Sequence, residues 1–282
     1  MQIYTKPEEL RRLRHELTLA GKTLAVVPTM GNLHDGHLSL IEKAQSLADL
    51  VICTIFVNPS QFGPEEDLDA YPRTPDADLT ALRRYHVDGV FTPGVEGMYP
   101  PGDETRVTVP ALSERHCGAV RPGHFTGVAT VVCKFLNMIQ ADFAVFGEKD
   151  FQQLAIIKRM VTDLFIPTEI HGAPTLRADD GLALSSRNAY LTGDERQRAP
   201  DLYRQLVLAR DRILQGERDF EGLELSAQDA LVRSGWRPDY FSVCSQQTLQ
   251  PASATDTDLV ILAAARLGQA RLIDNLTLNL KG

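Results

Sequence analysis

Two histidines three residues apart, His34 and His37, stand where an apolar segment of strand length (24–27) gives way to apolar residues at helical spacing. The free N–H groups and the positive dipole end at the start of a helix attract anions. Side chains one turn apart can face the same anion, and an imidazole N–H can stabilise charge that develops on a phosphate oxygen. Gly31 and Gly36 allow the chain to turn closely around a ligand. These residues therefore predict a phosphate-binding site.

The turn 147–150 carries a second candidate, Lys149, before a helical pattern that begins near Phe151. A lysine at the start of a helix can donate to a phosphate oxygen as a compact positive charge. Ligands of open α/β sheets bind outside the carboxyl ends of the strands, so we expect this turn near the turn with the histidines. A solvated pair with Asp150 is the alternative. Gln153, one helical turn further on, can point back at a small polar substrate.

Two side-chain amides, Asn58 and Gln61, follow the next apolar run after the histidines. Amides can hold the carboxylate and the hydroxyl of a small acid through paired hydrogen bonds. The alternative for Asn58 is a turn cap. Arg121 and His124 open another helical pattern, where they either attract a carboxylate or have a capping or interface role.

A polar loop further along the chain contains Ser185, Ser186 and Arg187. Its two hydroxyls and its guanidinium can bind a phosphate, the arginine bidentately. An ordinary helix-capping loop is the alternative for so short a string. Because glycine and polar residues give the loop 179–188 little apolar surface, we expect it to be mobile without a ligand.

The elements that must position these residues alternate between strand and helix, which predicts an α/β fold with a parallel, Rossmann-like nucleotide-binding sheet. After Arg177 a long charged helix and half-exposed strands predict a smaller α+β domain. We therefore expect a first domain over 1–177 and a second over 178–282. The expected strands are 23–27, 50–57, 88–91, 142–146, 168–176, 240–243, 259–262 and 271–280, and the expected helices include 76–85, 126–140, 194–215 and a first helix that ends near residue 19.

The composition is that of a globular protein of 282 residues, with 43% apolar and 23% charged residues and a formal net charge of −8. This balance offers no broad basic field for a polyanion, so we expect no nucleic-acid partner. No apolar stretch reaches the roughly 20 residues of a membrane span, so no membrane partner is expected either. No signal peptide is visible, and four widely separated cysteines predict reduced thiols in a cytoplasmic protein. Neither a Walker A loop nor a G-x-G-x-x-G turn follows any expected strand.

The string Pro-Thr-Met-Gly-Asn-Leu-His-Asp-Gly-His at 28–37 resembles the signature of the adenylate-forming nucleotidyltransferase superfamily, and within it the pantoate–β-alanine ligase family. Gly-Glu-Lys-Asp at 147–150 matches the same family, and Leu-Ser-Ser-Arg at 184–187 resembles the second superfamily signature. Ser60 stands where family members usually have methionine, and Cys117 where some have glutamate. The resemblance spans nearly the whole chain, in blocks at 28–37, 56–63, 71–74, 121–127, 147–153, 182–191 and 272–275.

The resemblance implies an ATP-dependent amide bond formation. (R)-Pantoate and ATP would give pantoyl adenylate and pyrophosphate, and β-alanine would then displace AMP to give pantothenate. The family resemblance also implies Mg²⁺ with the ATP, a cytoplasmic homodimer, and a small C-terminal domain that closes as a lid over His34 and His37.

The resemblance also implies roles for individual residues. The implied catalytic residues are His37, His34, Lys149 and Arg187. The implied pantoate-binding residues are Gln61, Gln153 and Asn58, with Gln61 also binding β-alanine, and no metal ligand is identified. The residues implied to bind ATP are Met30, Gly31, Asn32, Leu33, His34, Asp35, Gly36, His37, Gly147, Glu148, Lys149, Asp150, Leu176, Leu184, Ser185, Ser186 and Arg187.

Two other functions fit parts of the pattern. A plain nucleotidyltransferase would leave the adenylyl group on its product. Asn58, Gln61 and Gln153 favour a small polar acid, and a phosphate-bearing acceptor stays open as the alternative. An RNA-binding, synthetase-like module is disfavoured by the acidic charge and by the lack of an anticodon-type domain.

Overall fold

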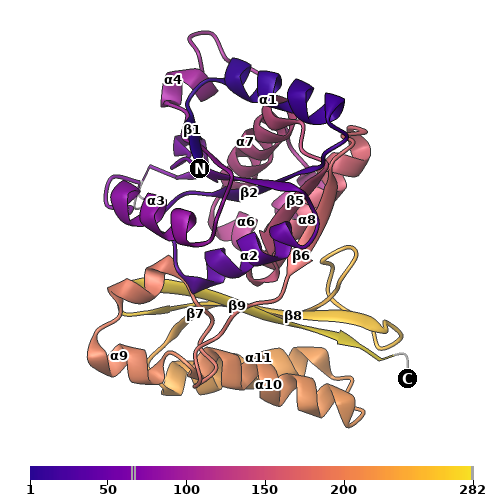
Figure 1. Cartoon of the computed structure of the whole chain (residues 1–282). Helices are drawn as coiled ribbons and strands as arrows, with labels where there is room; N and C mark the ends of the chain where they lie inside the picture. The colour runs from indigo at the N-terminus through magenta and orange to yellow at the C-terminus, as the bar shows by residue number, and fades with distance from the viewer. Residues whose placement is uncertain (65, 67, 281–282) are drawn as a thin grey trace. The chain divides into compact units, whose positions relative to one another are not determined.

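A computed structural model of the chain describes residues 1–64, 66 and 68–280 (Figure 1). The chain forms two compact units and passes between them more than once. The domain boundary expected after residue 177 stays a prediction, since the short segments 115–120 and 149–152 group with the second unit. Unit 1 comprises Met1–Glu114, Arg121–Glu148 and Gln153–Pro174, and unit 2 comprises Arg115–Val120, Lys149–Gln152 and Thr175–Gly282.

Unit 1 is built on a six-stranded sheet in which every neighbouring pair is parallel. The strands are β1 (Gln2–Tyr4), β2 (Leu24–Thr29), β3 (Leu50–Ile55), β4 (Gly89–Phe91), β5 (Phe143–Gly147) and β6 (Glu169–Ala173). Their order is β1-β4-β3-β2-β5-β6, so the chain proceeds from β2 towards one edge and from β5 towards the other. The carboxyl ends of β2 and β5 therefore flank a topological switch point, where ligands bind in open α/β sheets.

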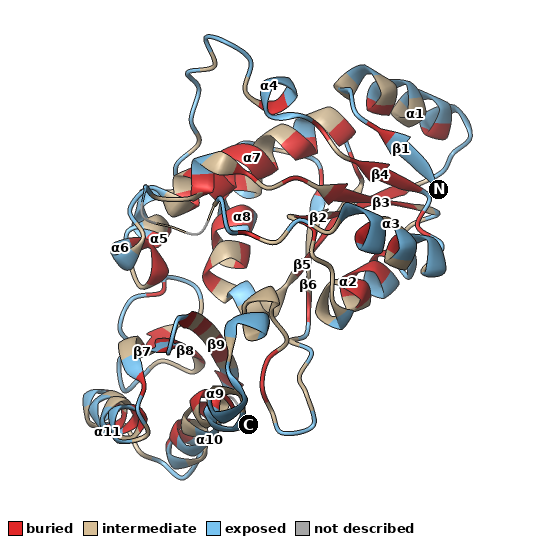
Figure 2. Ribbon diagram, turned by 90° about the vertical axis from the view of Figure 1, so that its left-hand side faces the viewer, coloured by how far each residue is buried: buried red, intermediate tan, exposed pale blue. Residues whose placement is uncertain are grey.

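Helices cover both faces of this sheet, as strands with apolar residues on both faces require. The helices of unit 1 are α1 (Pro7–Leu19), α2 (Asp35–Gln45), α3 (Pro75–Arg84), α4 (Val95–Met98), α5 (Pro110–Ser113), α7 (His124–Ile139) and most of α8 (Phe151–Asp163). On one face, Ile41 of α2 and Leu82 of α3 join Val27 of β2 in a buried cluster. On the other face α1 lies against α7, which packs on β2. Figure 2 shows the buried strands between helices whose outer sides are exposed.

Unit 2 is built on an antiparallel sheet with the strand order β7-β8-β9. Its elements are α6 (Cys117–Val120), α9 (Gly193–Arg198), α10 (Asp201–Leu214), α11 (Phe220–Arg233), β7 (Arg237–Ser245), β8 (Asp258–Leu267) and β9 (Ala270–Asn279). Helices α10 and α11 cover one face, where Leu206, Leu231 and Ile261 lie in a buried cluster. On the opposite face the hydroxyl of Tyr240 lies 2.9 Å from Sγ of Cys117, so the segment 115–120 packs there.

The structure confirms the predicted α/β class, with a parallel sheet flanked by helices and a smaller antiparallel sheet. The prediction of a single helix over 194–215 is wrong. The segment forms two helices, α9 and α10, because Pro200 has no N–H to continue the hydrogen bonding of α9. The strand expected to reach residue 176 ends at Ala173, and the pattern does not predict β1 or α11.

Candidate active site

A buried carboxylate fixes the loop between β2 and α2. Asp78 of α3 is 2% exposed, and its two oxygens accept hydrogen bonds from the backbone N–H groups of Asn32 at 2.9 Å and Leu33 at 2.8 Å. Thr74 adds a third hydrogen bond from its hydroxyl at 3.1 Å. Gly31 has φ +80°, and a Cβ there would lie 2.9 Å from Oδ2 of Asp78. The loop therefore depends on Asp78, a residue that the sequence motifs do not reveal.

His34 and His37 begin α2 at the carboxyl end of β2, as the sequence predicts. Nδ1 of His34 accepts a hydrogen bond from the backbone of Gly36 at 3.1 Å, and Nδ1 of His37 accepts one from the backbone of His34 at 3.4 Å. The two ring centroids are 4.1 Å apart. Because each Nδ1 is an acceptor, the proton of each neutral ring is on Nε2. The start of the helix therefore sets the tautomer that makes Nε2 a hydrogen-bond donor.

The side chain of Asn58 caps the turn η1 (Pro59–Gln61) that follows β3. Asn58 is 1% exposed, and its Nδ2 donates to Oε1 of Gln61 at 3.0 Å and to the carbonyl of Gly127 at 3.2 Å. A Cβ on Gly127 would lie 2.2 Å from the carbonyl oxygen of Ser60, so α7 approaches this turn only through a glycine. Asn58 is therefore a turn cap, as the alternative interpretation predicted. Its hydrogen bond to Oε1 also orients the amide of Gln61.

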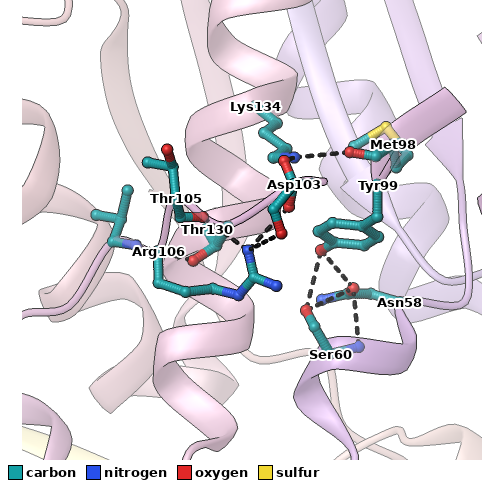
Figure 3. A network of polar contacts seen from close by, with 10 residues as sticks. Asn58, Ser60, Met98, Tyr99, Asp103, Thr105, Arg106, Thr130 and Lys134 are labelled. Carbon is teal, nitrogen blue, oxygen red and sulfur yellow. Dashed lines mark hydrogen bonds and ion pairs between the residues drawn. The ribbon is translucent and has the colours of Figure 1, made fainter. Parts of the chain in front are cut away.

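A tyrosine braces the same turn from the segment after α4 (Figure 3). The hydroxyl of Tyr99 donates to Oδ1 of Asn58 at 2.7 Å and lies 2.9 Å from Oγ of Ser60. Burial raises the pKa of Tyr99, which keeps this donor protonated. The ammonium of Lys134 lies 4.6 Å from the centre of the Tyr99 ring and also pairs with Asp103. Ser60 therefore takes part in a polar network with Asn58 and Tyr99.

The backbone of Gln61 is held from the start of α7. Nδ1 of His124 donates to the carbonyl of Gln61 at 2.8 Å, and Nε2 of His124 accepts from Arg121 at 3.0 Å. Arg121 also forms two hydrogen bonds with the carboxylate of Glu66, at 2.7 and 2.6 Å. Burial by itself raises the pKa of Glu66, but the hydrogen bonds and charge of Arg121 outweigh it and lower that pKa. In this structure Arg121 therefore binds the carboxylate of Glu66, a residue of the protein itself.

The turn after β5 is shared between the two units. Gly147 ends β5, and Glu148 begins the short helix η2 (Glu148–Asp150). Both residues belong to unit 1, whereas Lys149 and Asp150 belong to unit 2. The carbonyl oxygen of Lys149 accepts a hydrogen bond from Nδ2 of Asn275 at 2.9 Å. The position of Lys149 in unit 2 is thus tied to β9.

The segment that carries Ser185 to Arg187 begins as a small hairpin in unit 2. The backbone N–H of Leu184 donates to the carbonyl of Leu176 at 2.9 Å, and Gly181 forms the turn with φ +94°. Leu182 is 6% exposed and joins the buried cluster of the unit, and Ala183 is 4% exposed. The expectation of little apolar surface in this loop is therefore wrong for these two residues.

Ser185 caps the short helix that follows. Its Oγ accepts a hydrogen bond from the backbone N–H of Arg187 at 3.3 Å, at the start of η3 (Ser186–Tyr190). This is the capping role that stood as the alternative for the string. Lys149 and Ser185 also line one small cavity of unit 2, so the structure brings these two candidates together.

Within unit 1 the structure brings the turns after β2 and β3 into contact. Nε2 of Gln61 lies 3.1 Å from Sδ of Met30. The two loops that carry the candidate phosphate and acid sites are therefore neighbours. Gln153 is half-buried on α8 in the same unit.

The described part of the chain contains no group of three or more His, Cys, Asp or Glu side chains that could hold a metal ion. A membrane-spanning helix is also missing among the described residues, because none of the helices there is long and apolar enough.

The chain is similar to known proteins over almost its whole length. It is 54% identical to a pantothenate synthetase of Marinobacter nauticus, covering 96% of this chain and 97% of that protein. It is 56% identical to the pantothenate synthetase of Pseudomonas putida strain GB-1, covering 96% of both.

Two solved structures share the fold. The pantothenate synthetase of Thermus thermophilus superposes with a TM-score of 0.91 at 45% identity, covering 98% of this chain and 99% of that one. A pantoate–β-alanine ligase of Francisella tularensis, solved with β,γ ATP and β-alanine, gives a TM-score of 0.80 at 35% identity, covering 100% and 99%. The family model described as pantoate–β-alanine ligase matches residues 2–277. The chain therefore belongs to the pantoate–β-alanine ligase family and is an enzyme of the ligase class.

Proposed function

We propose that the protein joins (R)-pantoate to β-alanine in two steps at the expense of ATP. A carboxylate oxygen of pantoate attacks the α-phosphorus of ATP, a new C–O–P linkage forms, and pyrophosphate leaves. The amine of β-alanine then attacks the acyl carbon, AMP leaves with the electrons of the C–O bond, and the nitrogen releases a proton. Family membership over residues 2–277 and the ATP and β-alanine ligands of the Francisella tularensis relative support this reaction.

The arrangement of His34 and His37 is the observation that carries the phosphate chemistry. Both rings stand at the start of α2, and their Nδ1 atoms accept backbone hydrogen bonds, so both Nε2 atoms are donors. Donors that are fixed in advance stabilise the charge that develops on phosphate oxygens during the transfer. The residues from Met30 to His37 would bind the phosphates together with the positive end of the helix.

Gln61 is the best-oriented candidate for the acid. Its Oε1 accepts from Asn58, so its Nε2 faces away from that bond, near Sδ of Met30. An amide nitrogen has two hydrogens, and one of them can donate to a substrate carboxylate or hydroxyl. We propose that Gln61 and Gln153 contact pantoate, that Gln61 also contacts β-alanine, and that Asn58 serves the pantoate site by orienting Gln61.

Unit 2 supplies the remaining candidates. We propose that Lys149 compensates negative charge on the triphosphate, and that Ser185, Ser186 and Arg187 bind phosphate oxygens through two hydroxyls and a guanidinium. Asp150, Leu176 and Leu184 of unit 2, together with Gly147 and Glu148 of unit 1, complete the proposed set of ATP-binding residues.

Magnesium would enter with the nucleotide as part of the substrate. Mg²⁺ in nucleotide sites takes most of its ligands from phosphates and water, with one or two carboxylates at most. The lack of a three-ligand acidic or histidine cluster in the described residues is compatible with this mode. We also infer that the protein is a cytoplasmic homodimer. Size-exclusion chromatography with light scattering would test whether it is a dimer.

Pyrophosphate exchange into ATP tests the reaction. We expect exchange with pantoate and no amine, and none with other small hydroxy acids. With β-alanine added, AMP, pyrophosphate and pantothenate should form in equal amounts. Formation of ADP would indicate an acyl-phosphate ligase, and retention of AMP on the product would indicate a plain nucleotidyltransferase.

A further inference from the structure

We propose that two consecutive residues of β9, Asp274 and Asn275, are positioning residues that fix the ATP-binding segments of unit 2 relative to each other. This inference rests on the proposed function of Lys149 and of the loop 185–187. Side chains of successive strand residues point to opposite faces of a sheet. Each of these two residues therefore holds a different segment of the chain.

Asp274 holds the hairpin that leads to Ser185. Asp274 is 5% exposed, and its carboxylate forms two hydrogen bonds with Arg177, at 2.6 and 2.8 Å. The guanidinium of Arg177 lies 3.7 Å from the centre of the Tyr203 ring on α10 and donates to the carbonyl of Gly181 at 3.1 Å. A buried bidentate pair stacked on an aromatic ring leaves Arg177 little freedom.

The hairpin transmits that constraint to the candidate ATP residues. Arg177 pairs with Ala183 as an antiparallel bridge. The side chain of Asn188 donates to the carbonyl of Ala183 at 3.0 Å. Ser185 lies between these two fixed positions, so the start of η3 is anchored to β9 through Asp274.

Asn275 holds the other segment. It is 7% exposed, and its Nδ2 donates to the carbonyl of Lys149 at 2.9 Å. Its own backbone N–H donates to Oδ1 of Asp274 at 2.8 Å, which couples the two neighbours. A hydrogen bond at the carbonyl of Lys149 fixes the point from which that side chain extends.

The two segments meet at a cavity of about 10 Å³ lined by Lys149, Ser185, Asn188, Tyr203 and Asp274 among others. A cavity of this size holds no more than one water molecule. Asp274 is 5% exposed, and its carboxylate already accepts hydrogen bonds from Arg177 and from the backbone N–H of Asn275. Its role in this arrangement is to position other residues.

Asn275→Asp tests the inference, because it replaces the donor to Lys149 with a carboxylate of the same shape. We expect the KM for ATP in pyrophosphate exchange to rise about tenfold, the value of one lost hydrogen bond in a rigid site. The KM for pantoate should change little. The double variant Lys149→Ala/Asn275→Asp should be no worse than Lys149→Ala, because the second change acts only through Lys149.

Asn137→Asp is the matched control. Asn137 also donates from Nδ2 to a backbone carbonyl, that of Cys133 at 2.8 Å, but on the exposed side of α7. This variant should exchange pyrophosphate like the wild type. Asp274→Asn should likewise raise the KM for ATP, and combining it with Arg187→Ala should add little.

Additive effects in the double variants, or a wild-type KM in Asn275→Asp, would overturn the inference. Should Asn275→Asp fail to fold, Asn275→Leu removes the donor without adding a charge and should show the same rise in KM. Unfolding of both variants would mean that the bond holds the fold and not the site, which also overturns the inference. Failure of the proposed function is distinguishable, because the unaltered protein would then show no pantoate-dependent exchange. Failure of the proposed role of Lys149 is also distinguishable, because Lys149→Ala would then exchange pyrophosphate normally.

Discussion

Nε2 of Gln61 lies 3.1 Å from Sδ of Met30, and this contact joins the turn after β3 to the loop after β2. In the proposed reaction these two loops hold the acid and the nucleotide. Attack on the α-phosphorus needs the two reacting atoms about 3–3.5 Å apart. A substrate acid held by Gln61 is therefore beside the loop that leads to His34 and His37, where the phosphates would bind.

Substitutions of His37 can distinguish the role of Nε2 as a donor to phosphate from the role of Nδ1 as an acceptor at the start of α2. His37→Ala is expected to slow pyrophosphate exchange by about 10²–10³, and His34→Ala by less, because each removes a donor to the transition state. His37→Gln keeps an N–H near the position of Nε2, whereas His37→Asn keeps an acceptor near Nδ1. Exchange should thus be faster in the Gln variant than in the Asn variant.

The exposed His15 of α1 gives the control, since His15→Ala should leave exchange unchanged. Faster exchange in His37→Asn than in His37→Gln would mean that capping of α2, and not donation to phosphate, is the role of His37.

Gln61→Ala should raise the KM for pantoate by about 10–100-fold, because a site built to hydrogen-bond a polar substrate loses its donor. The KM for ATP should change much less. Gln45→Ala serves as the control, since Gln45 is exposed at the end of α2 and its amide donates to the backbone carbonyl of Tyr85. Equal effects of Gln61→Ala on both KM values would argue that it acts only by disturbing the loops.

Asp78→Asn should weaken both the loop and the fold. An amide would place an N–H against one of the two backbone donors from Asn32 and Leu33, so a buried bond is lost. We expect the free energy of unfolding in urea to fall by about 1–3 kcal/mol, with a rise in the KM for ATP. The exposed Asp76→Asn on the same helix should change neither. An unchanged KM for ATP would show that the loop keeps its shape without this carboxylate.

Much of this site is local in the sequence, and that part is predictable. His34, Gly36 and His37 are close together, and their spacing after an apolar run fixes the start of a helix. Asp78 escapes such reasoning, because it is 46 residues from Asn32 and has no motif of its own. The contacts of Asn275 and Asp274 are longer in range still, at 126 and 97 residues.

The same limit applies to the fold. Long apolar runs predict β2 and β3, whereas β1 has three residues, two of them exposed, and its partner β4 is 87 residues further on. The break between α9 and α10 is predictable from the sequence, because Pro200 has no backbone N–H and stands in an otherwise amphipathic pattern.

The pair of Glu66 and Arg121 should make stability depend on pH. The pKa of Glu66 is lowered in the folded protein, so the pair stabilises the fold above the ordinary pKa of about 4.3. That contribution is lost as pH falls through the folded pKa. Glu66→Gln should therefore lower the free energy of unfolding at pH 7 by about 1 kcal/mol, and the difference from wild type should vanish in acid.

Urea titrations at several pH values measure this difference, with the exposed Glu114→Gln as the control. A difference that stays constant down to acid pH would show that the charge of Glu66 has no part in it.

Ligand binding should protect the segment 185–190 from proteolysis. Leu182 and Ala183 anchor its start, whereas Tyr190 is exposed and offers a site for chymotrypsin. ATP with pantoate would add phosphate partners for Arg187, and a ligand stabilises only the state in which it makes better contacts. Cleavage after Tyr190 should therefore slow with both substrates present, while cleavage after Phe165, which is 92% exposed in unit 1, keeps its rate. Arg187→Ala should lose most of the protection at Tyr190. Equal cleavage of the unaltered protein with and without substrates would contradict the assignment of Arg187 to the ATP site, and the assignment of the histidines would still stand.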